Sequence, residues 1–327
     1  MTFATRRQAL AAIASSTLLG SRFAFSQSFP TRPIRLIVPF PAGGSVDQVA
    51  RGVAESMSKT LGQPVVIDNK AGANAAIGAS EVARSGADGY TLLFGSDSGL
   101  VLSPLLYKKL AYDVERDFTA VGVAVEVPLV LTVHPDVPAK TVAELVAYAK
   151  ANPRKLNYGS TGTGSIYHLT TELFCQHAGI EMTHIPYTGG APALNALVAH
   201  QVDVFISAIG TPLQFIKAGK LRPLAVLTRD PVPALPGVPT LTKSGVTGVE
   251  ATSRYGIVAP KETAPAIVSQ LNEALNVALA APKFRERFIG EGFAVPTGQS
   301  AADFERSMAR DRAMWRVVIA EKGLTLE

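Results

Sequence analysis

The feature that most constrains the fold is a repeated order of apolar run, glycine-bearing turn and amphipathic helix. IRLIVP (34–39) is followed by FPAGGSVD (40–47) and by apolar residues at helical spacing up to Leu61. LNY (156–158) is followed in the same way by GSTGTGS (159–165) and a second helical pattern. Strands that alternate with helices predict right-handed crossovers and a mostly parallel sheet, so the expected fold class is α/β.

The same reading extends along the rest of the chain. We predict further strands over 64–68, 90–94, 129–133, 182–186, 202–207 and 223–227, and further helices over 75–84, 165–178, 192–200, 213–218, 265–279 and 301–322. Another helix opens at a capping box made by Thr141 and Glu144. The pattern predicts two α/β units, the second beginning near residue 127, with extra helices at the C-terminal end. Ligands of open α/β sheets bind outside the carboxyl ends of the strands, where both glycine-bearing turns lie.

The first turn has the chemistry of anion capture. Gly43 and Gly44 expose backbone amides, and Ser45 is placed to cap the following helix, whose first N–H groups and dipole favour a carboxylate or phosphate. Asp47 lies in the first turn of that helix. It either stabilises the helix end or receives an amino group, a hydroxyl or a water molecule of a ligand.

The second turn adds hydroxyl groups to the backbone amides. Gly162 and Gly164 alternate in it with the hydroxyl residues Ser160, Thr161, Thr163 and Ser165. His168 follows on the first turns of the next helix, within reach of a ligand or satisfied by nearby backbone. Two more turns, GSDSG (95–99) with Ser96 and Ser98, and YTGGAP (187–192) with Tyr187, Gly189 and Gly190, follow predicted strands. Two units that face each other with four such turns predict a groove for a small molecule with anionic groups at both ends.

Nucleotide-binding patterns are absent. Neither turn contains lysine or arginine, and the one Gly-Lys pair, Gly219-Lys220, is followed by Leu221 rather than serine or threonine. The dinucleotide pattern fails because Tyr167 stands where a third glycine is needed. The pattern therefore favours a small organic anion over a nucleotide.

Catalytic and metal-binding patterns are also absent. No serine lies in a Gly-x-Ser-x-Gly elbow, and the histidines (His134, His168, His177, His184 and His200) show no metal-ligand spacing such as i, i+4 on one helix. Cys175 is the only cysteine, so no internal disulfide is possible. We expect no enzyme, no metal site and no cofactor.

The N-terminal residues 1–26 have the order of a secretory signal peptide. Arg6 and Arg7 precede an apolar run over 9–20 and small residues up to Ser26, after which cleavage is expected. The apolar run is shorter than the roughly 20 residues of a membrane span. The paired arginines fit both the twin-arginine and the ordinary export route. Cleavage would remove three of the 31 basic side chains and none of the 26 acidic ones, and no basic run marks a nucleic-acid partner.

Several segments resemble, in order, the substrate-binding proteins of tripartite tricarboxylate transporters, the Bug-type periplasmic receptors. They are PIRLIVPFPAGGSVDQVAR (33–51), GQPVVIDNKAGANAAIGA (62–79), ADGYTLL (87–93), SPLLYKKLAYDVERDF (103–118), LNYGSTGTGSIYHLTTELF (156–174), HIPYTGGAPALNALVAHQVDV (184–204) and LPGVPTLTKSG (235–245). The resemblance implies a periplasmic, monomeric two-lobed binding protein of the type II or Venus-flytrap class, without catalysis. Lobe I would comprise 27–126 and 255–327, lobe II 127–254, with crossing strands near 126–128 and 254–256 as the hinge.

The resemblance also implies a ligand and its binding residues. The ligand would be a small carboxylate, such as a dicarboxylic, amino, nicotinate-like or aromatic acid, held by the two turns and handed to permease subunits in the membrane. The residues carried over by position are Phe40, Ala42, Gly43, Gly44, Ser45 and Asp47 in the first lobe, Ser160, Gly162, Gly164, Ser165 and His168 in the second, and then Tyr187, Gly189, Gly190 and Asp203. Val46 stands where relatives commonly have threonine, and Arg254 where an aromatic residue is frequent, so the acid itself is not predicted.

Two other functions fit the same residues. An extracytoplasmic sensor of this fold would pass its signal to a membrane kinase instead of a permease. A hydrolase or other enzyme could also use a lobed α/β cleft, because fold does not fix function.

Overall fold

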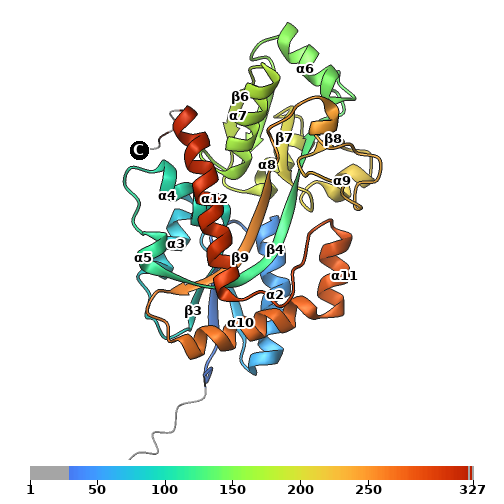
Figure 1. The fold of residues 1–327 in the computed structure, drawn as a ribbon. Helices are drawn as coiled ribbons and strands as arrows, with labels where there is room; N and C mark the ends of the chain where they lie inside the picture. Colours follow the sequence, from blue (N-terminus) through green and yellow to red (C-terminus); the bar gives the residue numbers. More distant parts are fainter. Residues whose placement is uncertain (1–28, 323–324, 326–327) are drawn as a thin grey trace, which may run out of the picture.

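The computed structural model describes residues 29–322 and 325, so the predicted signal peptide lies outside the described residues. Two groups of helices and strands are joined by the long strands β4 (Phe118–Val133) and β9 (Thr252–Pro260), as Figure 1 shows. No helix in the described part of the chain combines the length and the apolar character needed to cross a bilayer.

Lobe I is built from both ends of the described chain. Its N-terminal elements are β1 (Ile34–Val38), α2 (Ser45–Leu61), β2 (Val65–Asn69), η1 (Ala73–Ala75), α3 (Ala76–Ala83), β3 (Thr91–Ser96), η2 (Ser98–Leu102), α4 (Ser103–Leu106) and α5 (Val114–Asp117). Its C-terminal elements are α10 (Pro265–Ala280), α11 (Pro282–Gly290) and α12 (Ala301–Lys322). Helices α10 and α11 pack on α2, so the C-terminal helices return to the first lobe.

Lobe II contains the middle of the chain. Its elements are α6 (Val142–Ala151), β5 (Asn157–Ser160), α7 (Ile166–Ala178), β6 (Thr183–Pro186), α8 (Gly190–Val198), β7 (Val204–Ala208), α9 (Leu213–Lys217), β8 (Arg222–Val226) and η3 (Thr242–Ser244). The predicted capping box is present in part: the Thr141 hydroxyl accepts the N–H of Glu144 at 3.2 Å, while the Glu144 carboxylate accepts the N–H of Lys140 at 2.6 Å.

One nine-stranded sheet runs through both lobes in the order β2-β1-β3-β9-β4-β7-β5-β6, with β8 also paired to β4. Pairing is parallel among β1, β2 and β3 and among β5, β6 and β7, and antiparallel wherever β4 or β9 takes part. Strand β1 lies between two parallel neighbours and is buried on both faces, which explains why it reads as a nearly continuous apolar run.

Helix α2 shows how the sequence sets an element that positions the site. Its buried residues recur at helical spacing from Val46 to Met57 and pack into the core. The helix ends at Gly62, whose φ of 66° places it in the left-handed region that favours glycine. The packing of this buried face fixes the N-terminal end of α2 beside the carboxyl end of β1.

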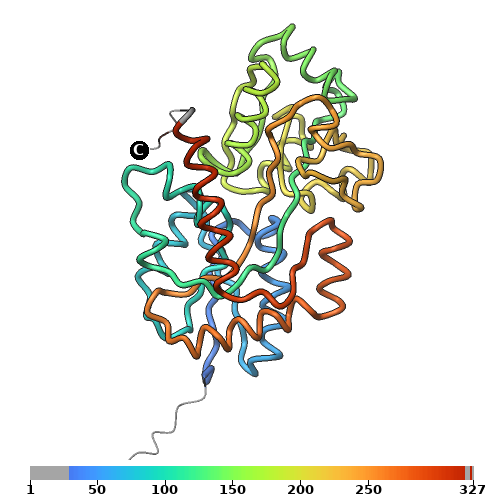
Figure 2. The backbone as a smooth tube through the Cα atoms, viewed as in Figure 1, coloured from blue at the N-terminus to red at the C-terminus, as the bar shows by residue number. Residues whose placement is uncertain are grey.

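The hinge consists of β4 and β9 side by side. Glu126 pairs with Arg254, and Pro128 pairs with Thr252, so the predicted crossing segments lie in these two strands. Figure 2 shows the two connections, green and orange, running together between the lobes. The lobe boundaries at 126/127 and 254/255 stay a prediction.

Several elements differ from the sequence prediction, among them the short helices α4 and α5 and most of β9, which were not predicted, and two longer elements. Strand β4 begins at Phe118 rather than at residue 129, because the first part of it pairs with β9 in lobe I before the chain crosses. Helix α11 was not predicted, since Pro282 and the four charged residues of PKFRERFIG obscure an apolar face that consists mainly of Phe284 and Phe288.

Candidate functional site

A small cavity lies between the lobes at the carboxyl ends of the central strands. Its lining residues come from β1, α2, β3, α7, α8 and β9 and the turns beside them: Phe40, Gly44, Ser45, Val46, Ser96, Ser98, Thr161, Ile166, Tyr167, Gly190, Thr211, Ser253 and Tyr255. None of these side chains is charged. The volume that the centre of a water molecule can reach is ≈ 20 Å³, which is room for about one water molecule. The lobes are therefore closed on each other, and a larger ligand has to enter through an open form.

The first residues of three helices line this cavity. Gly44, Ser45 and Val46 belong to the start of α2, Ile166 and Tyr167 to α7, and Gly190 to α8. The N-caps of α2 and α8, Gly44 and Gly189, make no side-chain cap hydrogen bond. Helix starts carry unpaired N–H groups and the positive end of the dipole, so this geometry favours an anion.

Two hydroxyl groups of the cavity wall add to this character. The Oγ of Ser96 and the Oγ1 of Thr161 are buried and have no hydrogen-bond partner among the described residues. A buried unpaired hydroxyl costs free energy of about 1–3 kcal/mol unless a ligand or water satisfies it. The cavity is therefore built for a polar group that accepts hydrogen bonds.

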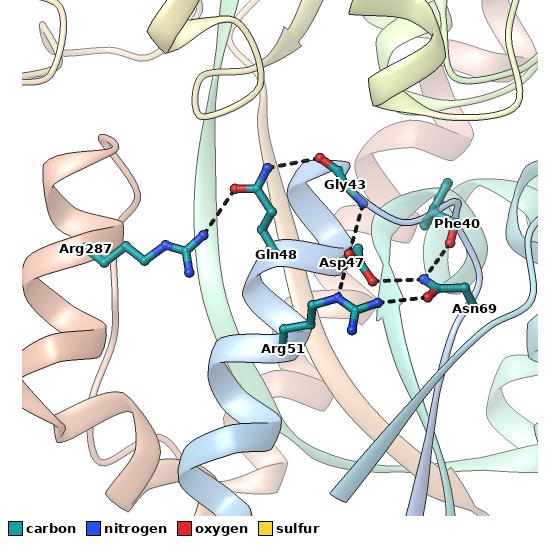
Figure 3. Close-up of polar contacts among 7 residues, drawn as sticks. All are labelled: Phe40, Gly43, Asp47, Gln48, Arg51, Asn69 and Arg287. Atoms are coloured by element: carbon teal, nitrogen blue, oxygen red, sulfur yellow. Dashed lines mark hydrogen bonds and ion pairs between the residues drawn. The ribbon is translucent and has the colours of Figure 1, made fainter.

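The carboxylate of Asp47 supports the first turn from behind and does not line the cavity. It accepts hydrogen bonds from the Gly43 N–H at 3.0 Å, from Arg51 Nε at 2.9 Å and from Asn69 Nδ2 at 2.9 Å (Figure 3). Burial raises the pKa of Asp47, but the hydrogen bonds from Arg51, Gly43 and Asn69 outweigh it, and the pKa lies below its usual value. Of the two roles that the sequence left open, the structure shows the stabilisation of the turn.

Further contacts fix the same turn (Figure 3). Asn69 also donates to the carbonyl of Phe40 at 3.0 Å, and Gln48 donates to the carbonyl of Gly43 at 3.0 Å. Arg287 of α11 reaches Gln48 at 3.4 Å. Gly43 itself has a φ of 86°, which a side chain would strain. The turn is thus preorganised by polar contacts on its outer side, with its inner side left to the cavity.

The second turn is built in the same way. Ser165 caps α7 by accepting the N–H of His168 at 3.3 Å, and Gly164 donates its N–H to His168 Nδ1 at 3.1 Å. The Ser160 hydroxyl turns inward and contacts the Gly162 backbone and His184 Nε2, the latter at 2.6 Å. These residues shape the turn, and Thr161 is the one that faces the cavity.

Stacked rings support this turn from below. The rings of His168 and His184 lie 4.1 Å apart, and Tyr158 stacks on His184 at 5.0 Å. Burial lowers the pKa of His168 and of His184 to about 4 in each case. Both imidazoles are therefore neutral near pH 7, and His168 can accept the Gly164 N–H.

Tyr255 of β9 joins the helix starts of the two lobes. Its hydroxyl lies 2.9 Å from Ser45 Oγ at the start of α2 and 3.2 Å from the Tyr167 hydroxyl at the start of α7. Burial raises the pKa of Tyr255 to about 12, so the group stays neutral. The sequence prediction missed Tyr255 and Tyr167. Strand alternation could have indicated Tyr255, because Ser253 and Tyr255 line the cavity while Arg254 between them points elsewhere.

Arg254 lies on the other face of the hinge. Its side chain pairs with Glu126 of β4 at 3.0 Å and with Asp311 of α12. Its backbone N–H donates to the buried carboxylate of Asp97 at 2.7 Å, and burial raises the pKa of Asp97 to about 6. The arginine at position 254, where the resemblance implies an aromatic residue, therefore acts at the hinge and on α12, since its side chain does not line the small cavity.

A second, larger cavity adjoins the first and shares Phe40 and Thr161 with it. The centre of a water molecule can reach ≈ 310 Å³ in it. Its other lining residues are Pro39, Gly72, Ala73, Asn74, Ala75, Tyr107, Gly162, Thr163, Pro186, Tyr187 and Thr188. Residues 73–75 all have positive φ values, of 45°, 48° and 76°. Three consecutive non-glycine residues in this region are strained, and such strain concentrates at functional sites.

The remaining predicted site residues lie elsewhere. Ala42 is exposed on the outside of the first turn, and Gly189 lies against Pro41 where the two lobes meet. Asp203 is at the opposite end of the strands, where its N–H donates to the carbonyl of Asn157, the first residue of β5. Asp203 therefore does not join the cavity residues, because the cleft lies at the carboxyl end of β5.

Comparison with known proteins agrees with this geometry. The family model of the tripartite tricarboxylate transporter family receptor matches residues 49–324. The chain belongs to this receptor family. Members of this family are periplasmic solute-binding receptors, and the two-lobed fold predicted from the resemblance is confirmed.

Three solved structures show the similarity of the receptor family to this chain in detail. A protein of R. palustris solved with adipate is 37% identical, with a TM-score of 0.88 over 91% of this chain and 99% of that chain. The periplasmic binding protein BugD is 36% identical, with a TM-score of 0.87 over 91% of this chain and 100% of that chain. MatC of Rhodopseudomonas palustris, solved with bound malate, is 32% identical, with a TM-score of 0.86 over 89% of this chain and 100% of that chain.

Proposed function

We propose that this protein is an exported receptor that captures a small carboxylate between its lobes and delivers it to a tripartite tricarboxylate-type transporter in the membrane. The observation that carries the proposal is the uncharged cavity where α2, α7 and α8 begin, with the unpaired hydroxyls of Ser96 and Thr161 in its wall. Neutral N–H and O–H donors at helix starts stabilise a carboxylate without a cationic side chain. Adipate and malate, seen in two relatives, belong to this chemical class.

The two cavities divide the ligand between them. One carboxylate oxygen occupies the small cavity, and the rest of the molecule extends past Phe40 and Thr161 into the larger one. The larger cavity offers apolar and aromatic surface together with Asn74, whose Oδ1 is buried without a partner among the described residues. It accommodates an acid with a chain of several carbons and one further polar group.

The mechanism follows from the closed state. An open form admits the acid, and contacts from both lobes then stabilise the closed form, because the ligand binds the closed form with higher affinity. The hinge strands β4 and β9 carry this motion, and the expected release of ligand occurs when the transporter favours the open form.

The test is direct binding. Native mass spectrometry of freshly purified protein identifies any co-purified acid, and calorimetry after its removal measures affinity for adipate, malate, an aromatic acid and an uncharged diamide of adipate. We expect at least one acid to bind and the diamide not to bind. Failure of every carboxylate to bind the protein from which any co-purified acid has been removed would contradict the proposal.

A point variant tests the position of the carboxylate. Gly44→Val is suited to this because Gly44 has a φ of −75°, which any residue adopts, and a Cβ there would lie 3.9 Å from the Ala191 N–H nitrogen across the cleft. The added methyl groups occupy the space of the anion. Gly86→Val, on a loop of lobe I where the nearest atom to a Cβ is 4.0 Å away, serves as the matched control. Unchanged affinity in Gly44→Val would place the anion elsewhere.

A further inference from the structure

Two histidines of lobe II, His134 and His200, lie face to face at the end of the sheet opposite the cleft. His134 follows β4, His200 follows α8, and the two ring centroids are 4.0 Å apart with planes 13° from parallel. The His134 N–H donates to the carbonyl of Asp203, which neighbours the first residue of β5. The pair is therefore separate from the ligand cavities.

The carboxylate of Asp136 faces both imidazoles. Its Oδ2 lies 3.6 Å from His134 Nδ1 and 3.5 Å from His200 Nδ1. Metal–ligand bonds of about 2.0–2.2 Å in a tetrahedral site leave neighbouring ligand atoms about 3.4 Å apart. One ligand atom from each of the three residues lies within 4.8 Å of the others. The three groups thus already stand close to the spacing of a shared ion.

Asp203 orients one of the imidazoles from behind. Its Oδ1 lies 3.1 Å from His200 Nε2, and its Oδ2 accepts the Asn157 N–H at 2.7 Å. An Nε2–H that donates to Asp203 leaves the lone pair on His200 Nδ1, which faces Asp136. A carboxylate behind the histidine is the usual way in which proteins fix a metal-binding imidazole.

The backbone at His200 is in an unusual conformation. Its φ of 54° lies in the left-handed region, which few non-glycine residues adopt. Backbone hydrogen bonds from His200 to Leu197 at 3.1 Å and from Gln201 to Ala196 at 2.8 Å hold this turn. These two hydrogen bonds form the common left-handed C-cap of α8, and this helix end places the imidazole over His134.

We propose that His134, Asp136 and His200 bind one divalent transition-metal ion of the Zn²⁺ type, with water completing the coordination. Two imidazoles and one carboxylate suit Zn²⁺, Ni²⁺ or Cu²⁺, whereas Mg²⁺ and Ca²⁺ require mainly oxygen ligands. Because the rings are nearly parallel, the ion turns the more exposed ring, that of His200, toward Asp136. The hydrogen bond of 3.3 Å from the Asp136 N–H to His134 Nδ1 breaks when the ion binds, because the Nδ1 lone pair then coordinates the ion. Spacing within one helix could not indicate this site, since its ligands follow β4 and α8.

The experiment uses tag-free, chelator-stripped full-length protein in a buffer without carboxylates. Zn²⁺ is titrated against a chromophoric competitor, and Mg²⁺ is titrated in parallel by thermal shift. The variants are His134→Ala and His200→Asn, the second chosen because asparagine tolerates the left-handed backbone. His177→Ala, an exposed histidine of the same lobe, is the control. Circular dichroism verifies that each variant is folded.

We expect one Zn²⁺ per chain, at least tenfold weaker binding in His134→Ala and in His200→Asn, and unchanged binding in His177→Ala. Asp203→Asn should weaken binding on the order of tenfold, as expected for a residue that orients a ligand. Carboxylate affinity should be the same in all variants, since the site is remote from the cleft. Equal Zn²⁺ affinity in the wild type and in a His134→Ala/His200→Asn double variant, or Mg²⁺ binding as tight as Zn²⁺ binding, would overturn the proposal.

Discussion

The hydroxyl of Tyr167 offers the sharpest test of how the lobes hold each other. It makes the 3.2 Å contact with the Tyr255 hydroxyl, and its ring packs edge-on against Phe205 at 6.0 Å. Tyr167→Phe removes the hydroxyl and keeps the ring packing. Tyr255 keeps its 2.9 Å contact with Ser45, so no second buried group loses all of its partners.

The magnitude of the change in ligand affinity follows from the one hydrogen bond between the lobes that is lost, since the second contact of the Tyr167 hydroxyl, with the backbone of Ala208, lies within lobe II. A neutral hydrogen bond contributes about 0.5–1.5 kcal/mol net. Tyr255 pairs with Ser96 of β3 in lobe I, whereas Tyr167 opens α7 in lobe II, so the bond exists only when the lobes are closed. The whole loss therefore falls on the closed form, and ligand affinity should weaken about 2- to 13-fold.

The assay combines calorimetry with small-angle scattering on stripped protein. The acid that the wild type binds best is titrated into wild type, Tyr167→Phe and the control Tyr148→Phe, which changes a tyrosine of the outer helix α6. We expect weaker binding in Tyr167→Phe alone, with a smaller change in the free energy of unfolding of the ligand-free protein, from the lost contact with the Ala208 backbone. Wild-type affinity in Tyr167→Phe, or an equal loss of stability without ligand, would refute the reasoning.

Three further substitutions test other parts of the structure. Gly189→Ala places a Cβ 2.7 Å from Pro41 Cδ across the lobe interface, which prevents full closure of the lobes. Ligand binding should weaken at least tenfold in calorimetry, while the melting temperature of the ligand-free protein changes little. The wild type should lose stability as pH falls from about 6.5 to about 4, because the unfolded chain protonates His168 and His184 in this range before the folded one does. His168→Asn keeps an acceptor for the neighbouring N–H and should show a shallower loss in melting curves between these pH values; an identical slope would contradict the assignment. Gly62→Ala should lower the free energy of unfolding in urea by about 1 kcal/mol, since its left-handed φ of 66° is strained for alanine although no atom lies within 4 Å of a Cβ.

Much of the fold could be predicted because the chain repeats a simple local order. Apolar runs of four to six residues and helical spacing such as that of α2 identify elements without knowledge of their neighbours. The long strand β4 could not be predicted to its full length, because its first half is defined by pairing with β9, more than a hundred residues later. Periodicity carries no information about such a partner.

The candidate site was predictable at the level of turns and not of side chains. Glycine and hydroxyl residues identify both turns, but whether Ser160 or Thr161 faces the cleft depends on the local backbone, including the φ of 123° at Gly162. Asp47 and His168 have the chemistry of ligand-binding residues, and their side chains accept backbone N–H groups that hold the turns, which the sequence alone could not show. Tyr255 reaches the cavity from the hinge, a tertiary relation that no local pattern contains.

The uncapped starts of α2 and α8 have a consequence for the evolution and engineering of such receptors. Their N–H donors belong to the main chain, so side-chain substitution leaves these donors in place so long as the turns keep their shape. The walls of the larger cavity, such as Asn74 and Tyr107, are free to vary around this constant anchor. A library randomised at the walls alone should yield biosensors for different acids, each reporting through the same closing motion.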